Sequence, residues 1–268
     1  MDRYLHIIKL IFLYSVVFFS AKMYSDPLRP DQRIRDTKNQ IVKSKEPDLE
    51  LVKWPRANVY ELGLQFSNNR IDGFQIQNNT KGTLVSETNM AASIQYYNWI
   101  KRSYDVSIGL HIESIHMLEE TNAIPIDNSQ VLAIGLNVMF RYLIVENLYL
   151  KAILADDSKI FYSPNATLSG YELQTPMIPS LGAGASVMFA EIKKIKIGIE
   201  GMVKLYQSSS AGNYQIDSGT GYEIKLFTMW PRGTQQIISE FYYNGRTQNT
   251  TIIRTEEQKI GFGVKYQF

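Results

Sequence analysis

The sequence predicts an all-β fold, a transmembrane antiparallel up-and-down β-barrel of about ten strands. Large apolar side chains recur at every second position in successive runs from residue 56 to the end of the chain, which is the period of a strand whose two faces differ. The runs are about 9 to 12 residues long, near the length that a tilted strand needs to cross the hydrocarbon of a bilayer. The links between them alternate between short and long, as the two rims of such a barrel require.

Residues 1–25 are predicted to be a signal peptide. Arg3 and Lys9 precede the apolar run 10–19, and small residues follow it. This run is too short to span a membrane comfortably as a helix. An uncleaved inner-membrane anchor stays open as an alternative, because residues 22–23 fit a cleavage site poorly.

Residues 26–55 are predicted to form a flexible leader that precedes the barrel at 56–268. The segment is rich in charged residues and proline and has few large apolar side chains to bury. A docked plug, or a short helix over residues 40–51, is the alternative. No later stretch is apolar enough to cross a bilayer as a helix, so a membrane location requires strands.

Ten runs with a period of two follow one another along the chain. They cover residues 60–67, 84–98, 103–113, 132–141, 148–154, 181–189, 195–204, 222–230, 237–244 and 260–268. Bacterial single-chain barrels have even strand counts, so ten strands are preferred. Eight is the alternative if the second or ninth run is irregular, and twelve if residues 71–77 form an additional strand.

The links fall into two classes that alternate along the sequence. Short links lie near residues 98–102, 144–147, 191–194 and 231–234, and long polar links near 68–83, 118–129, 156–176, 208–218 and 246–250. A barrel of ten strands whose first and last strands begin and end at the same rim requires four short links at that rim and five long links at the other. Pro231 and Gly233 are suited to a tight turn, and the long links are rich in the Asn, Ser, Thr and Gly of solvated loops.

The last strand has the most specific pattern. Its large apolar residues alternate with small or polar ones, and the chain stops on an aromatic: Ile260, Phe262, Val264, Tyr266 and Phe268. This segment resembles the closing strand of small bacterial outer-membrane β-barrel proteins, where it is the cue read by the assembly machinery. The resemblance implies a periplasmic leader, residence in the outer membrane of a diderm bacterium, and outer-membrane lipid and the barrel-assembly machinery as partners.

The polar face of the strands carries many charges of both signs. A charge that cannot face lipid must face the lumen, so these residues are predicted to line the barrel interior: Glu61, Asp105, Glu113, Arg141, Lys151, Lys196, Glu200, Lys204, Glu223, Lys225, Glu240, Lys259 and Lys265. An interior of this width is nearly filled by side chains. A salt-bridge network is therefore expected, with an open polar channel as the alternative.

Composition excludes several classes of function. The chain has no cysteine, which excludes disulfides, thiolate metal sites, a cysteine nucleophile and a lipidated cysteine. Without residues 1–25 its acidic and basic residues are equal in number, which gives no basic surface for a nucleic acid. The abundant Tyr and Phe suit the aromatic belts of a membrane barrel. A soluble β-sandwich is the alternative.

No catalytic or cofactor site is predicted. Outer-membrane proteases of the omptin class have paired aspartates and an Asp-x-His arrangement, whereas this chain has Asp156-Asp157, His111 and His116 but no Asp-x-His. A Gly-x-Ser-x-Gly elbow is also missing, and three histidines without cysteine make no zinc set. The sequence therefore predicts a monomeric, non-enzymatic surface or structural protein that recognises an unidentified extracellular ligand through long loops. A narrow porin-like channel is the alternative, and an outer-membrane protease or lipase is less expected.

Overall fold

The computed structural model describes residues 58–77, 80–101, 103–121, 126, 129–145, 147–164, 171–211, 214–232 and 235–268. The predicted signal peptide and leader lie outside the described residues. Within these residues, no helix has the length and apolar character needed to cross a membrane.

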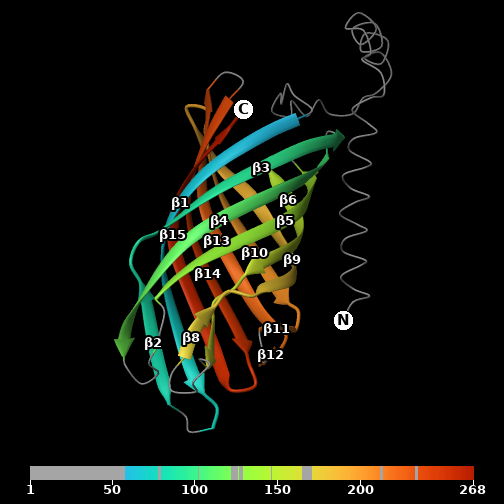
Figure 1. The fold of residues 1–268 in the computed structure, drawn as a ribbon. Coiled ribbons are helices and arrows are strands. Elements are labelled where there is room, and N and C mark those ends of the chain that lie inside the picture. The colour runs from blue at the N-terminus through green and yellow to red at the C-terminus, as the bar shows by residue number, and fades with distance from the viewer. Residues whose placement is uncertain are drawn as a thin grey trace, which may run out of the picture. The chain divides into compact units, whose positions relative to one another are not determined.

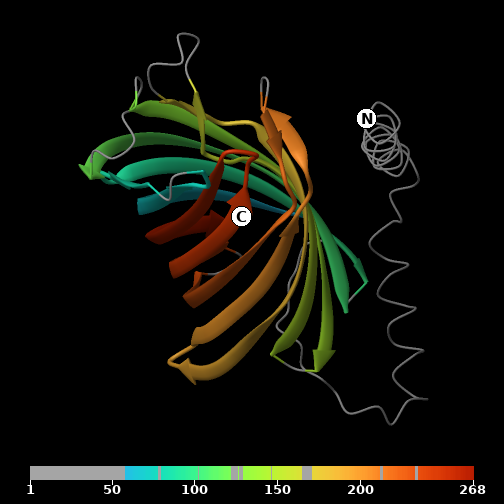
Figure 2. The same ribbon diagram turned by 90° about the horizontal axis from the view of Figure 1, so that it is seen from below.

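The fold prediction is confirmed: ten antiparallel strand positions close into a ring (Figures 1 and 2). The long strands are β1 (Asn58–Gln75), β3 (Asn89–Lys101), β4 (Tyr104–Thr121), β5 (Gln130–Val145), β6 (Leu148–Ser158), β9 (Met177–Ile192), β10 (Ile195–Tyr206), β13 (Gly219–Arg232), β14 (Gln235–Asn249) and β15 (Ile253–Gln267). The ring closes where β1 pairs with β15, from Glu61 opposite Gln267 to Gln75 opposite Ile253. Closure leaves no open edge in the wall.

The second predicted strand occupies one place in the ring, but a bulge divides it into two segments. β2 (Lys81–Ser86) and β3 both pair with β1 and β4, and the register shifts by one residue between them. Hydrogen bonds of polar side chains stabilise the backbone at the bulge. Asn89 Nδ2 donates to Ser86 Oγ at 2.8 Å, and the backbone N–H of Asn69 donates to the same hydroxyl at 2.6 Å. A bulge bends a strand without ending its role in the sheet, so the ring keeps ten positions.

The two rims differ in their connections. Four tight turns join β3 to β4, β5 to β6, β9 to β10 and β13 to β14 at the rim where the chain ends, here called the inner rim. Lys193 and Lys194 have positive φ, as a two-residue hairpin turn requires. At the opposite, outer rim the longer connections carry two small hairpins, formed by β7 (Phe161–Pro164) with β8 (Tyr171–Gln174) and β11 (Ser209–Ala211) with β12 (Tyr214–Ile216).

The outer surface of the wall carries a continuous belt of large apolar side chains. They are exposed in the isolated chain, among them Leu62, Leu64, Phe66, Ile94, Leu136, Phe140, Leu150, Leu154, Leu181, Phe189, Ile199, Val203, Ile224, Leu226, Phe241, Ile260 and Val264. We call this the lipid-facing belt. A soluble monomer rarely exposes an apolar surface of this extent, whereas the hydrocarbon of a bilayer requires it.

The strands continue beyond the belt toward the outer rim, which corrects two predicted loops. Residues 68–75 belong to β1 and residues 246–249 to β14, although both lie within predicted long links. In this outer part of the barrel the polarity of the two faces is reversed, with polar side chains outside and apolar side chains inside. Asn68 and Arg70 point outward, whereas Ile71 is fully buried inside. The outer end of the barrel therefore has an apolar interior and a polar exterior, as a water-soluble protein has.

Candidate functional site

The charged residues predicted for the lumen all lie on the inner face of the wall. Asp105 is fully buried against Arg141, and the others line one continuous interior cavity of about 370 Å³ together with Lys196, Lys259 and Lys265. Period-two alternation explains this placement, because residues two apart on one strand share a face.

A lysine near the inner rim joins two carboxylates from different strands. Lys265 Nζ of β15 lies 2.9 Å from Glu240 Oε2 of β14 and 3.7 Å from Glu61 Oε1 of β1. Gln267 Nε2 donates to Glu61 at 2.6 Å, and Gln65 Nε2 donates to Glu240 at 2.8 Å. Each carboxylate thus has a charged and a neutral donor, which offsets the cost of burying it.

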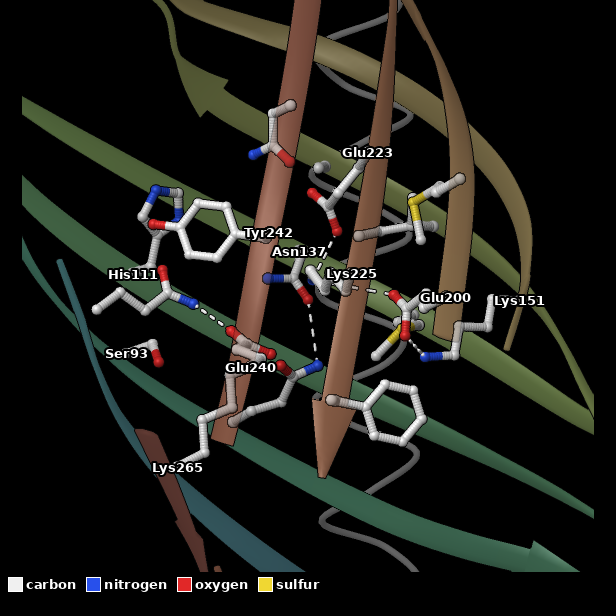
Figure 3. A pocket seen from close by; sticks show the side chains of 18 of the residues that line it. Ser93, His111, Asn137, Lys151, Glu200, Glu223, Lys225, Glu240, Tyr242 and Lys265 are labelled. Carbon is white, nitrogen blue, oxygen red and sulfur yellow. Dashed lines mark hydrogen bonds and ion pairs between the residues drawn. The ribbon is translucent and has the colours of Figure 1, made fainter. Parts of the chain in front are cut away.

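A second group spans β6, β10 and β13 (Figure 3). Lys225 Nζ lies 2.6 Å from Glu223 Oε1 and 3.9 Å from Glu200 Oε1. Lys151 is hydrogen-bonded to Glu200, and Lys204 Nζ lies 3.4 Å from Glu223 Oε2. Lysines and glutamates therefore alternate across β6, β10 and β13, with β9 lying between β6 and β10 in the ring, and the group is nearly neutral.

Asp105 and Arg141 form the most enclosed pair. The Arg141 Nε donates to Asp105 Oδ1 at 2.9 Å and lies 3.0 Å from Oδ2, and the guanidinium lies 4.5 Å from the ring centre of Tyr97. The Tyr97 hydroxyl in turn donates to Glu61 at 3.2 Å. The stacked, paired guanidinium links the polar groups of β1, β3, β4 and β5 into one network.

A second lysine of the seam strand β15 reaches across the lumen to β4. Lys259 Nζ lies 2.5 Å from Glu113 Oε2 of β4, and Ser67 Oγ of β1 donates to the same carboxylate at 2.9 Å. Lys196, near the inner rim, has no ion-pair partner among the described residues. Among the described residues the interior charges are thus largely paired, and Lys196 and the exposed turn residue Lys194 are left without an ion pair at the inner end.

The connection between β6 and β9 crosses the outer mouth of the barrel. We call residues 159–164 and 171–174 the outer plug. The Tyr162 ring packs on Gly73 of β1, where a Cβ would lie 2.7 Å from a ring carbon, and Gln75 Nε2 of β1 donates to the Tyr171 hydroxyl at 2.9 Å. Since β1 and β6 are separated by β3, β4 and β5 in the ring, these contacts reach across the opening.

Arg246 of β14 anchors the plug from another side. Its Nη2 donates to the backbone carbonyl of Ile160 at 2.9 Å, its Nε lies 2.9 Å from Glu257, and its guanidinium lies 4.6 Å from the ring centre of Phe161. Glu257 lies above the lipid-facing belt. Burial alone would raise the pKa of its carboxyl, but Arg246 and Lys159 together hold that pKa below its ordinary value. The ion pair is therefore charged at neutral pH.

Apolar side chains from the plug and the wall form a closed cluster beneath the outer rim. Its buried members are Ile71, Leu84, Ile115, Met117, Ala133, Ile160, Tyr162, Leu173 and Ile253. Ile115, Ala133 and Ile160 also line the interior cavity, whose other end reaches the exposed turn residues Lys194 and Pro231. The cavity consequently opens at the inner rim and ends at an apolar roof below the outer rim.

The candidate catalytic residues of the sequence do not form one group. Asp156 and Asp157 lie on opposite faces of β6, and only Asp157 lines the cavity. His111 and Asp157 both lie over Gly135, where a Cβ would be 2.3 Å from His111 Nδ1 and 2.5 Å from Asp157 Oδ1. His116 is on the outer surface, 3.5 Å from Glu87. Across the described residues no group of three or more His, Asp or Glu is placed to hold a metal ion.

The last strand completes the wall at the inner rim. The N–H of Phe268 donates to the Tyr60 carbonyl at 2.9 Å, and the N–H of Tyr60 donates to the Phe268 carbonyl at 3.0 Å. The Phe268 ring lies between those of Tyr60 and Tyr266, with ring centres 6.0 and 5.7 Å away. Phe268 is thus part of the closing seam, and its proposed role as an assembly cue remains a prediction.

Phe268→Ala is expected to reduce the amount of folded barrel in the membrane of cells far more than it reduces intrinsic stability. Refolded from urea into detergent, the variant loses aromatic contacts worth only about 1 kcal/mol. Heat-modifiable migration of membrane fractions measures the folded amount in cells. Ile192→Ala, an exposed apolar residue at the same rim, is the control. Equal losses for the two variants would contradict the assembly role.

Comparison with known proteins gives only remote structural similarity. The outer membrane protease OmpT from Escherichia coli aligns over 80% of this chain and 97% of its own, with 8% identity and a TM-score of 0.43. An outer membrane channel from Pseudomonas putida F1 aligns over 84% and 99%, with 8% identity and a TM-score of 0.46. The translocator domain of the autotransporter NalP from Neisseria meningitidis aligns over 87% and 93%, with 9% identity and a TM-score of 0.38. No protein family model and no curated protein sequence matches the chain.

Proposed function

We propose that the chain is a non-enzymatic outer-membrane protein of a diderm bacterium whose barrel carries a structured recognition surface at its outer end. The lipid-facing belt supports residence in a membrane, and closure of the ring satisfies the backbone within it. The observation that carries the proposal is the outer plug. An apolar cluster across the outer mouth supports a closed scaffold better than an open passage.

The outer end has the character of a binding surface. The β7–β8 and β11–β12 hairpins are fixed on the barrel by buried side chains, among them Phe161, Ile178, Tyr206 and Ile216. Connections held on a rigid scaffold are common positions for recognition. Asp156 and Asp157 point to opposite faces of β6, which supports a role other than that of a paired-aspartate protease.

Reconstitution into planar bilayers tests the closed state. The purified full chain is expected to give no reproducible current steps, because the apolar cluster blocks the path of ions. Insertion is verified in the same preparation by protection of the wall from added protease. Discrete, reproducible steps from the unmodified protein would overturn the proposal of a closed scaffold.

A narrow channel for small solutes is the second candidate. The interior cavity of about 370 Å³ that opens at the inner rim favours it, since among the described residues the outer plug and the apolar cluster beneath it separate this cavity from the outer surface. The bilayer recordings distinguish the two candidates directly. Hydrolysis of a peptide or lipid substrate by the purified chain would contradict both.

A further inference from the structure

Among the residues that the structure describes, the outer half of the cavity contains buried amide groups without hydrogen-bond partners. Asn69 of β1 is 3% exposed, and neither its Nδ2 nor its Oδ1 has a hydrogen-bond partner in the described part of the chain. The Oδ1 of Asn244 on β14 is also buried, and no described residue is hydrogen-bonded to it. Both residues line the cavity, and both stand opposite Lys259 in the register of the seam strand. Buried polar groups are normally satisfied, so unpaired amides that face a cavity indicate a missing partner.

The charges next to these amides are already paired. Lys259 Nζ lies 2.5 Å from Glu113, and Glu113 also accepts from Ser67 at 2.9 Å. A charged solute would have to displace one of these partners and leave a buried charge unpaired, which is costly. An uncharged solute leaves the ion pairs intact.

The chemistry of the free groups narrows the choice of solute further. Asn69 offers one donor and one acceptor group and Asn244 a further acceptor, so a partner that both donates and accepts satisfies them. Tyr242, two residues before Asn244 on the same face of β14, is buried and presents its ring in the same pocket beside His111 (Figure 3). Hydroxyl groups on a compact carbon skeleton meet both requirements. The whole cavity has a volume of about 370 Å³, so its outer half admits only a compact solute.

We propose that the outer half of the cavity binds a small neutral polyhydroxylated solute of the monosaccharide class, which enters from the inner rim. Asn69 and Asn244 supply the hydrogen bonds, and the Tyr242 ring contacts the carbon skeleton. The roof formed by Ile115, Ala133 and Ile160 limits the length of the ligand. Because entry is from the inner rim, the site does not require the outer plug to move, and it goes beyond the recognition role proposed for the outer surface.

Titration calorimetry of the full chain in detergent tests the site with D-glucose, its anionic relative D-gluconate and its cationic relative D-glucosamine. Saturable binding of D-glucose is expected, with binding of each charged relative weaker by about tenfold or more. Asn69→Leu removes both free amide atoms and is expected to weaken D-glucose binding about tenfold, the effect of one or two lost hydrogen bonds. Asn244→Leu is expected to weaken it in the same direction.

Asn68→Leu is the matched control, since Asn68 immediately precedes Asn69 on β1 but points outward. It is expected to leave the affinity unchanged. Heat-modifiable migration verifies that each variant is folded, and Asn244→Leu carries the test if Asn69→Leu does not fold. The proposal is overturned if D-glucose shows no saturable binding, if D-gluconate binds as tightly as D-glucose, or if Asn68→Leu and the cavity variants lose affinity equally.

Discussion

Replacing residues 161–174 with a short glycine-serine link is expected to convert a silent barrel into a conducting one. The link is geometrically simple, because the N–H of Lys159 already donates to the Pro176 carbonyl at 3.0 Å, which places the two ends side by side. A hairpin link of about four residues therefore closes the gap without disturbing β6 or β9. The replacement removes Tyr162 and Leu173, which pack in the same apolar cluster as the roof residues Ile115, Ala133 and Ile160, and so weakens the closure above the cavity.

The expected readout is discrete current steps in planar bilayers where the unmodified chain gives none. Replacing residues 210–215 with a similar link is the matched control, because it shortens the other outer hairpin and leaves the larger apolar cluster intact. That variant is expected to stay silent. A folded variant without residues 161–174 that also stays silent would show that the ion-paired side chains alone close the lumen.

Asp105→Ala is expected to lower the free energy of unfolding by about 3–5 kcal/mol, because it leaves the Arg141 guanidinium buried without its carboxylate. Asp105 is fully buried and faces Arg141 through both of its oxygens. Urea unfolding from lipid vesicles, followed by tryptophan fluorescence, measures the change. The double variant Asp105→Ala with Arg141→Leu is expected to recover much of the loss, since no unpaired charge then remains.

Glu256→Ala is the comparison for an exposed pair. Glu256 lies 2.6 Å from Arg254 on the outer surface of β15, where both side chains are accessible to water. Such a pair contributes about 0–1 kcal/mol. If Asp105→Ala cost no more than Glu256→Ala, the lumen would be as wet as the outer surface, and the description of a filled interior would be wrong.

The sequence was sufficient to predict the wall of the barrel at membrane depth. There the outward positions are apolar and the inward ones are polar, so residues such as Leu62 and Glu61 are assigned to opposite faces by alternation alone. The interruption at Glu87 and Thr88 did not alter the predicted strand number. The extra residue is absorbed within one wall position by hydrogen bonds of Ser86 and Asn89.

The outer end could not be predicted in the same way. Along β1 the alternation continues past Phe66, but beyond this residue the apolar side chain of Ile71 faces inward and the charged side chain of Arg70 faces outward. A pattern that expects the apolar residues to stay on the outer face therefore places the end of the strand too early. The plug depends on contacts between distant segments, such as that of Arg246 with Ile160, which is 86 residues away. Alternation within a strand contains no information on such a contact. The grouping of Asn69 with Asn244 also depends on the tertiary structure, because the two residues lie on different strands and only the closed ring brings their amides to one cavity.

The exchange of inner and outer polarity near Phe66 has a consequence for how the molecule responds to its surroundings. Above this level an apolar cluster that excludes water packs beside the Arg246–Glu257 ion pair, whereas below it the belt contacts acyl chains and the interior is held together by ion pairs. Cooling and dilute urea weaken the hydrophobic packing of the apolar cluster. Salt acts mainly on exposed charges and little on buried pairs. The outer end and the membrane-spanning wall therefore depend on different forces although they belong to one continuous sheet. We expect the outer end to loosen on cooling or in dilute urea while the wall stays closed.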